Sequence, residues 1–399
     1  MSTFKIRKDN SALSTHLVHS APIGPEGFQS LATPLYRASS TFFNNTAAQR
    51  APIDTLGLDY SYGLHGNPTR YTLAKKLAEI EGAQHALVCP SGLAAIALVA
   101  QACLKQSDHW LIPENAYGPV HALADDLQQF GITFSEYDPC NLHSVKSNIQ
   151  PNTQLIWTEA PGSLTFEVPD LQSIVQLAKQ AHIKTAIDNT WSAGIALKPF
   201  ELGLDYSVQA LTKYQSGHAD VLMGAVLCKH TEQFSAIERK SRLYGFGVSP
   251  DDCAMVLRGL LTLPLRYKHQ GDKGHVIAKA LQEFPAVARV LHPALAGSLG
   301  HNFFVRDFKG QASVFAVVLK AEYSDVQACS IVDALTQFRI AYSWGGPESL
   351  ALVVNIPEKR KRNLGTAGQP CGPILRLAIG LEDEIDLLND LKQAFSRVQ

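Results

Sequence analysis

The chain has 399 residues, of which 46% are hydrophobic and 18% are charged, and its formal net charge is -1. This length and composition are typical of a folded globular protein with a large domain and a smaller one, and not of a disordered or fibrous chain. The near-zero charge gives no net attraction to nucleic acid or to an anionic membrane, so we expect a small-molecule partner.

Targeting and cysteine patterns indicate a cytoplasmic protein. The N-terminal residues have no apolar stretch behind their charges, and no segment supplies the roughly 20 uninterrupted apolar residues of a membrane helix. The seven cysteines are scattered without a C-x-x-C pair, a pattern that disfavours zinc and redox sites. We therefore predict no signal peptide, no membrane span and no metal site.

Apolar periodicity divides the chain into an arm and two domains. Residues 1–60 lack a regular period and are interpreted as an N-terminal arm. A large domain over 61–260 opens with a helical repeat of apolar residues that stops at Gly82. Strands follow near 86–89, 110–112, 155–157, 185–187, 206–211 and 221–223, with helices near 91–104, 120–130 and 170–182. This alternation predicts a mainly parallel sheet covered on both faces.

After about residue 260 the pattern becomes that of a smaller α+β domain over 261–399. Strands are predicted near 313–319 and 373–379, and helices near 324–337 and 383–396. Because ligands bind at the carboxyl ends of the strands in open α/β sheets, polar residues that follow the strands of the large domain are the first candidates for a site.

Two such candidates are Asp188 and Lys213. Asp188 follows the apolar run 184–187, and Lys213 follows the half-apolar run 206–211. Each has an ordinary explanation when taken alone, a turn cap for the aspartate and a surface position for the lysine. Together they match the needs of a pyridoxal cofactor, which requires a Schiff-base amine and an acid that keeps the pyridine nitrogen protonated.

A third candidate is the turn Pro90-Ser91-Gly92-Leu93, which leads from a predicted strand into a predicted helix. Small residues there leave the first helix amides uncovered, and helix N-termini bind phosphate groups. The signal is weak by itself, because Ser-Gly also opens many helices as a plain cap. No G-x-G-x-x-G or Walker-type loop follows the early strands, which disfavours a nucleotide-dependent enzyme.

With these motifs in this order, the chain resembles the cysteine and methionine metabolism family of pyridoxal-phosphate (PLP) enzymes, and within it the bacterial cystathionine β-lyases. The resemblance runs almost end to end. It is carried by Tyr62-Gly63, Gly66-Asn67-Pro68-Thr69, Ser91-Gly92-Leu93, Asn115-Ala116-Tyr117, Asp188-Asn189-Thr190-Trp191, Thr212-Lys213-Tyr214, Gly217-His218, Tyr342-Ser343-Trp344-Gly345-Gly346 and Leu375-Arg376-Leu377. It implies a type I, aspartate-aminotransferase-like fold, whose large domain has a mainly parallel seven-stranded sheet.

The resemblance also implies roles for individual residues. Lys213 would bind PLP covalently, Asp188 would pair with its ring nitrogen, and Tyr117 would stack on the ring. The phosphate would be bound by Gly92, Leu93 and Thr212 and, from a neighbouring subunit, by Tyr62. The substrate would be bound by Tyr117, Ser343, Trp344 and Arg376, the last of which would grip the α-carboxylate as a planar bidentate donor.

Two positions separate this chain from other members of the family. At Trp344 other members usually place an aliphatic residue, so the tryptophan favours the β-lyase subfamily. At Leu64 the family commonly has an arginine that joins Tyr62 at the phosphate. His65 or Arg70 could replace that cation, or cofactor affinity could be weaker.

The implied activity is PLP-dependent β-elimination that cleaves L-cystathionine to homocysteine, pyruvate and ammonia in methionine biosynthesis. Lys213 would remove the α-proton, and Lys213 or Tyr117 would protonate the leaving thiolate. A methionine or cystathionine γ-lyase and a cystathionine γ-synthase share this apparatus and stay open as alternatives, as does a catalytically silent homologue. The resemblance further implies a cytoplasmic homotetramer, built as a dimer of dimers.

Overall fold

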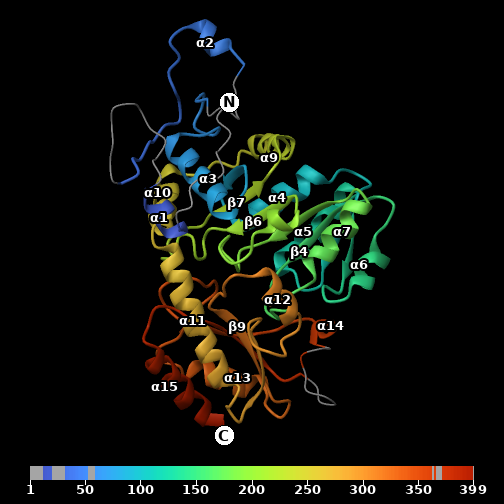
Figure 1. The fold of residues 1–399 in the computed structure, drawn as a ribbon, viewed down its shortest axis with the longest axis vertical. Coiled ribbons are helices and arrows are strands. Elements are labelled where there is room, and N and C mark those ends of the chain that lie inside the picture. Colours follow the sequence, from blue (N-terminus) through green and yellow to red (C-terminus); the bar gives the residue numbers. More distant parts are fainter. Residues whose placement is uncertain (1–11, 20–31, 53–58, 362–363, 365–370, 399) are drawn as a thin grey trace.

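The computed structural model describes residues 12–19, 32–52, 59–361, 364 and 371–398, which form two lobes with one β-sheet in each (Figure 1). The predicted fold class, a mainly parallel seven-stranded sheet with a smaller α+β unit, is confirmed. No helix in the described ranges is long and apolar enough to cross a membrane. The same residues contain no group of three or more His, Cys, Asp or Glu side chains that could hold a metal ion.

The larger sheet has the strand order β1-β7-β6-β5-β4-β2-β3. Its strands are β1 (His85–Cys89), β2 (His109–Pro113), β3 (Thr133–Tyr137), β4 (Thr153–Glu159), β5 (Lys184–Asp188), β6 (Tyr206–Ala210) and β7 (Gly224–Cys228). Only β7 runs against the others, since it pairs antiparallel with both β1 and β6. The parallel strands therefore end at one shared edge, where ligands bind in sheets of this kind.

Different helices cover the two faces of this sheet. Val88 packs with α3 (Pro68–Glu81), whereas its neighbours Leu87 and Cys89 pack with α4 (Gly92–Cys103) on the other face. This alternation follows from the two-residue period of a strand. The remaining helices of this lobe are α5 (Gly118–Leu127), η1 (Gln128–Phe130), α6 (Leu142–Asn148), α7 (Leu171–Gln180), α8 (Pro199–Leu202), α9 (Thr231–Leu243) and α10 (Pro250–Leu260).

Local sequence explains where α3 and α4 begin and end. The Asn67 side chain accepts a hydrogen bond from the Arg70 N–H at 2.9 Å, and Gly82 ends α3 with a φ of 79°. The Ser91 side chain accepts from the Ala94 N–H at 3.0 Å at the start of α4. The sequence predicts the end at Gly82 and the cap at Ser91, whereas the Asn67 cap is seen only in the structure. Short polar side chains satisfy free helix amides, and glycine adopts the left-handed conformation cheaply.

The smaller sheet has the order β10-β11-β12-β9-β8. Its strands are β8 (Val287–Leu291), β9 (Val314–Leu319), β10 (Arg339–Ile340), β11 (Leu350–Val354) and β12 (Ile374–Ala378). Its helices are α11 (Leu263–Leu281), α12 (His301–Asp307), α13 (Asp325–Asp333), α14 (Glu358–Lys361), α15 (Glu384–Phe395) and η2 (Ser396–Val398). The sequence analysis predicts β9, β12, α13 and α15.

Several predictions of individual elements were wrong or incomplete. The strand expected at 221–223 begins instead at Gly224. Strands β3, β8, β10 and β11 were missed; β3 is only partly buried, so its apolar signal is weak. The N-terminal arm is not wholly irregular, since it contains the short helices α1 (Leu13–His19) and α2 (Thr46–Arg50).

Candidate active site

The carboxyl edge of the larger sheet brings together the two residues that the sequence paired. Asp188 is the last residue of β5, and Lys213 lies in the turn that follows β6, the adjacent parallel strand. The carboxylate of Asp188 acts electrostatically on Lys213 and favours its charged form. The fold therefore places the predicted amine and the predicted acid in one site.

Lys213 is largely buried, and its amine has specific neighbours. Its Nζ donates a hydrogen bond to the Ser343 hydroxyl at 2.8 Å and lies 5.5 Å from the centroid of the Trp344 ring. Burial, assisted by the positive charge of Arg376, lowers the pKa of Lys213 to about 8. Burial thus increases the fraction of the amine that is unprotonated near neutral pH, and the unprotonated form is the one that nucleophilic and general-base chemistry requires.

Asp188 both caps a turn and lies close enough to Lys213 to act on its charge. Its Oδ1 accepts a hydrogen bond from the Thr190 N–H at 3.0 Å, which closes a turn as the simple interpretation expects. Burial raises the pKa of Asp188, while hydrogen bonds from Thr190 and the charge of Lys213 counteract that shift. The Asp188 carboxyl group therefore interacts with Lys213 while it also stabilises the turn at Thr190.

Arg376 lies in β12 and reaches the same site from the smaller lobe. Its Nη2 donates to the Ser343 carbonyl at 3.0 Å and to the Ala341 carbonyl at 3.4 Å. Its Nε is buried and has no hydrogen-bond partner among the described residues. Burial lowers the pKa of the guanidinium, so an incoming carboxylate would find a poorly solvated cation with an unused donor.

The Ser343–Trp344 segment approaches the lysine turn very closely. Ser343 has a φ of 76°, and a Cβ added at Gly345 would lie 3.0 Å from the Tyr214 backbone nitrogen. The Trp344 ring packs edge-on against Tyr214, with centroids 5.4 Å apart. Glycine at 345 is required both by its positive φ and by this approach.

Tyr117 precedes α5 and is 47% exposed. Burial raises the pKa of its hydroxyl; Asp188 and Glu159 raise it further, and Arg376 lowers it. The backbone N–H of Tyr117 donates to the Glu159 Oε2 at 2.7 Å. Glu159 was missed by the sequence analysis, yet it ends β4 as Asp188 ends the neighbouring β5, and that equivalence could have revealed it.

The turn before α4 has the shape expected of a phosphate cradle. A Cβ added at Gly92 would lie 2.8 Å from the Ala210 Cβ, and one at Gly224 would lie 2.2 Å from the Ser91 carbonyl oxygen. The small residues therefore let the helix N-terminus approach the end of β6. The amides of Gly92 and Leu93 belong to the first turn, where a helix offers no acceptor of its own.

Thr212 and Tyr62 have different surroundings within this chain. The Thr212 hydroxyl accepts from the Met223 N–H at 3.1 Å and donates to the Met223 carbonyl at 3.3 Å. Both hydrogen bonds of the Thr212 hydroxyl are thus made to the backbone of Met223. Tyr62 is 50% exposed, and its contacts within the described part of the chain include Ser40 and His65, neither of which belongs to the Lys213 group.

Position 64 holds leucine where the family commonly has arginine, and neither Arg70 nor His65 offers a free cation in its place. Arg70 is buried, and it donates to the Leu64 carbonyl at 2.7 Å and to the Val88 carbonyl at 3.3 Å. His65 lies 2.7 Å from the Ser61 hydroxyl. Burial, together with the positive charge of Arg242, lowers the pKa of His65, so its neutral form is favoured at neutral pH.

The residues present fit pyridoxal phosphate. A partly buried amine of lowered pKa, a partly buried carboxyl group and a helix N-terminus lie around one sheet edge, which is the donor set that this cofactor uses. The family model for "Cys/Met metabolism PLP-dependent enzyme" matches residues 14–396. The chain belongs to this family. It is therefore an enzyme whose cofactor is PLP.

Relatives of this PLP-dependent enzyme carry out several reactions. It is 37% identical to a cystathionine beta-lyase of Bordetella avium over 98% of this chain and 99% of the relative. It is 34% identical to an L-alanine/L-glutamate racemase of Wolbachia pipientis, over 92% and 93%. The crystal structure of a Xanthomonas oryzae cystathionine gamma synthase in complex with cystathionine matches with a TM-score of 0.87 and 29% identity, over 98% and 99%.

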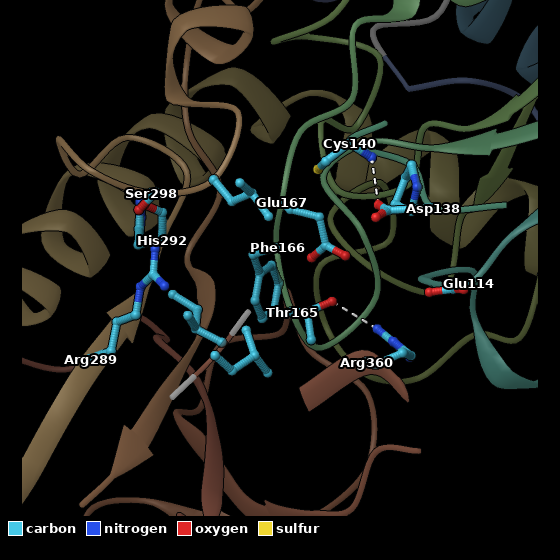
Figure 2. A pocket seen from close by; sticks show the side chains of 14 residues that line it. Glu114, Asp138, Cys140, Thr165, Phe166, Glu167, Arg289, His292, Ser298 and Arg360 are labelled. Atoms are coloured by element: carbon cyan, nitrogen blue, oxygen red, sulfur yellow. Dashed lines mark hydrogen bonds between the residues drawn. The ribbon is translucent and has the colours of Figure 1, made fainter. Parts of the chain in front are cut away.

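A cleft that is open to solvent lies between the two lobes, and Figure 2 shows side chains that line it. Its lining residues come from both lobes and include Glu114, Asp138, Cys140, Thr165, Phe166, Glu167, Arg289, His292, Ser298 and Arg360. The Arg360 guanidinium bridges the lobes, because its Nη2 donates to the Thr165 hydroxyl at 2.8 Å. Lys213, Asp188 and Arg376 do not line it.

Proposed function

We propose that this PLP-dependent enzyme is a carbon–sulfur β-lyase that cleaves L-cystathionine to homocysteine, pyruvate and ammonia. The observation that carries the proposal is the position of Trp344, whose ring lies 5.5 Å from the Lys213 Nζ and packs on Tyr214. The residue that distinguishes the β-lyase subfamily therefore contacts the amine that does the chemistry. The cystathionine beta-lyase of Bordetella avium, similar along nearly the whole chain, supports the same assignment.

Distinct residues would hold each part of the cofactor. Lys213 would bind it covalently, Asp188 would pair with the ring nitrogen, and Tyr117 would stack on the ring. The phosphate would be bound by Gly92, Leu93 and Thr212, and by Tyr62 from a neighbouring subunit. Because the Thr212 hydroxyl is shared with the Met223 backbone, the two helix amides would supply most of the phosphate binding from this chain.

When bound, PLP delocalises the negative charge that develops at the substrate Cα. Arg376 binds the substrate α-carboxylate through the donors that its bond to the Ser343 carbonyl leaves free. The Lys213 amine, whose pKa is lowered to about 8, removes the α-proton. Lys213 or Tyr117 then donates a proton to the sulfur as the Cβ–S bond breaks, and water releases ammonia and pyruvate from the remaining fragment.

Product analysis tests this function and separates it from its rivals. Purified protein is examined for bound PLP by its visible absorbance and is then incubated with L-cystathionine. Pyruvate with homocysteine supports the β-lyase. 2-Oxobutyrate would assign a γ-lyase, and a γ-synthase would form cystathionine from cysteine and an activated homoserine. A colourless protein that takes up no added PLP would indicate a silent homologue.

A racemase is the second candidate, because two proton-handling groups, Lys213 and Tyr117, are coupled to the same carboxylate, Asp188. The Wolbachia relative is named for that activity. Chiral chromatography of L-alanine incubated with the enzyme tests it. Formation of D-alanine without release of an oxo acid from L-cystathionine would replace the β-lyase assignment.

We further propose a cytoplasmic homotetramer with a large domain over 61–260 and a C-terminal domain over 261–399. Large apolar side chains stand exposed on the single chain, among them Phe42, Tyr62, Leu243 and Leu265, and such surface is commonly buried between subunits. Light scattering coupled to size-exclusion chromatography measures the mass. A monomer that is fully active would contradict both the tetramer and the role of Tyr62.

A further inference from the structure

The PLP site contains a carboxyl group that the proposed reaction does not use. Glu159 is the last residue of β4 and stands directly opposite Asp188 in the register of β4 with β5. Its Oε2 accepts the Tyr117 N–H at 2.7 Å. It thus joins the end of β4 to the residue that precedes α5, in the segment that follows the neighbouring strand β2.

We propose that Glu159 is a positioning residue, whose carboxyl oxygen holds the Tyr117 backbone so that the tyrosine ring is fixed over the cofactor. This inference rests on the proposed function, in which Tyr117 stacks on PLP. Glu159 acts on the reaction through Tyr117 and not by direct contact with substrate.

Tyr117 needs such an anchor because little else fixes it. Its side chain is 47% exposed, and as the N-cap of α5 it makes no side-chain capping bond. Its carbonyl accepts the Val120 N–H at 2.8 Å, which fixes the helix side of the residue. The bond from its N–H to Glu159 fixes the other side. Loss of that bond would let the ring move relative to Asp188, and a displacement of about 1 Å can cost 10²-fold in rate.

The groups around Glu159 indicate whether the charge of its carboxyl group or only its oxygen acceptor is needed to hold Tyr117. The groups that act on it are Asp188 and Glu167, both acidic, the cation Arg360, and the Tyr117 N–H. Burial, followed by the charge of Asp188, raises the pKa of Glu159 well above its ordinary value. Two adjacent, partly buried carboxyl groups disfavour each other's ionisation. The bond from the Tyr117 N–H requires only an oxygen acceptor, which a carboxyl group offers whether or not it is ionised.

This conclusion separates the positioning role from two others. A proton donor at 159 would need its ionisable proton, so glutamine could not replace it. A purely structural residue would affect how much protein folds and binds PLP, but not the turnover of each PLP-loaded site. A positioning residue predicts that glutamine works, and that a side chain of similar length without an acceptor does not.

Glu159→Gln and Glu159→Met, compared as PLP-loaded enzymes, provide the test. Both side chains have nearly the length of glutamate, but only glutamine offers an oxygen. The measurements are hydrogen exchange of the Tyr117 amide, the visible circular dichroism of bound PLP, and kcat per bound PLP with its pH profile. Glu167→Met is the matched control, because the Glu167 Oε2 has no hydrogen-bond partner among the described residues (Figure 2).

Glu159→Gln should keep Tyr117 exchange slow and kcat within about threefold of wild type, with an unchanged pH profile. Glu159→Met should speed exchange at least about tenfold, alter the dichroism and lower kcat per bound PLP by about 10–100-fold. Glu167→Met should change none of these. If Glu159→Met does not fold, Glu159→Asp takes its place, since the shorter side chain withdraws the oxygen from the Tyr117 N–H.

Two results would overturn the proposal. One is a glutamine variant as inactive as the methionine variant, which would make Glu159 an acid catalyst. The other is a methionine variant with normal kcat per bound PLP and normal Tyr117 exchange. Failure of wild type to form pyruvate would instead remove the β-lyase assignment, while amide exchange and dichroism would still decide whether Glu159 positions Tyr117.

Discussion

The hydroxyl of Ser343 accepts a hydrogen bond from the Lys213 amine at 2.8 Å, although the two residues belong to different lobes. The carbonyl of the same serine accepts from the Arg376 guanidinium at 3.0 Å. One residue of the smaller lobe therefore contacts both the group that would bind the cofactor and the group that would bind the substrate carboxylate. The relative position of the lobes consequently controls the chemistry.

The partly buried Lys213 amine should lower the free energy of unfolding of the PLP-free protein by a measurable amount. Burial lowers its pKa from 10.5 to about 8, so between these values the unfolded chain holds a proton that the folded chain lacks, and stability rises with pH. The full cost is present below about pH 8. We expect Lys213→Met without PLP to be more stable than wild type by about 1–3 kcal/mol at pH 7, after loss of the Ser343 bond is subtracted.

Urea unfolding of both PLP-free proteins at pH 7 and pH 10 checks this expectation. The advantage of the variant should shrink at the higher pH, where the wild-type lysine is neutral in the folded protein and partly neutral in the unfolded chain. A variant that is less stable than wild type at pH 7 would contradict the inferred burial cost.

Capture of PLP by the PLP-free enzyme should depend on the same ionisation. Only the unprotonated Lys213 amine attacks an aldehyde, so the rate should rise with pH and level off above about pH 8, near its lowered pKa. Stopped-flow absorbance measures the rate between pH 6 and pH 9. A rate that still rises steeply at pH 9 would show that the amine keeps the ordinary lysine pKa of about 10.4 and is exposed when PLP arrives.

Replacement of Arg376 by lysine should weaken substrate binding more than it slows turnover. The lysine keeps a positive charge but loses the planar pair of donors, and the Ser343 carbonyl loses its partner at 3.0 Å. We expect KM for L-cystathionine to rise about 10–100-fold, with kcat reduced less than tenfold. Steady-state kinetics, with PLP content measured in parallel, provides the check. A change in kcat alone would assign Arg376 to a different step.

Trp344 should influence both Lys213 and the choice of product. Trp344→Leu removes the ring that lies 5.5 Å from the lysine Nζ and the edge-on contact with Tyr214. The cation–π contact favours the charged amine by about 0.5–2 kcal/mol, so the pKa of Lys213 should fall further. We expect lower kcat/KM for L-cystathionine and a larger fraction of 2-oxobutyrate. Trp344→Phe keeps an aromatic face and serves as the control; an unchanged product ratio in Trp344→Leu would remove Trp344 as the discriminator.

A cation at position 64 should strengthen PLP binding. Arg70 is buried and bonded to the Leu64 and Val88 carbonyls, so it is not free to reach a phosphate. Leu64→Arg should lower the PLP dissociation constant about tenfold through a charge-assisted bond. Equilibrium binding to the PLP-free protein measures the change, and Leu64→Met controls for side-chain bulk. Equal affinity in Leu64→Arg and wild type would show that position 64 does not face the phosphate.

The sequence by itself predicted most strands of the larger sheet and the pairing of Asp188 with Lys213 at one edge of that sheet. The end of helix α3 and the start of helix α4 are predictable because their caps, Gly82 and Ser91, act on amides and carbonyls a few residues away. Asp188 and Lys213 are predictable because each follows a strand pattern, and parallel strands end at one edge. A partly buried strand such as Thr133–Tyr137 was missed, since it has no clear apolar pattern.

Only the tertiary structure decided how these residues act on one another. The lowered pKa of Lys213, the bond of Ser343 to both Lys213 and Arg376, and the anchoring of Tyr117 by Glu159 all join segments far apart in the chain. In the sequence Arg70 is a candidate cation for the phosphate, whereas in the fold its side chain is buried and bonded to two backbone carbonyls. Local patterns specify secondary structure, whereas burial and long-range contacts, which set ionisation and hydrogen bonding, exist only after the two lobes pack.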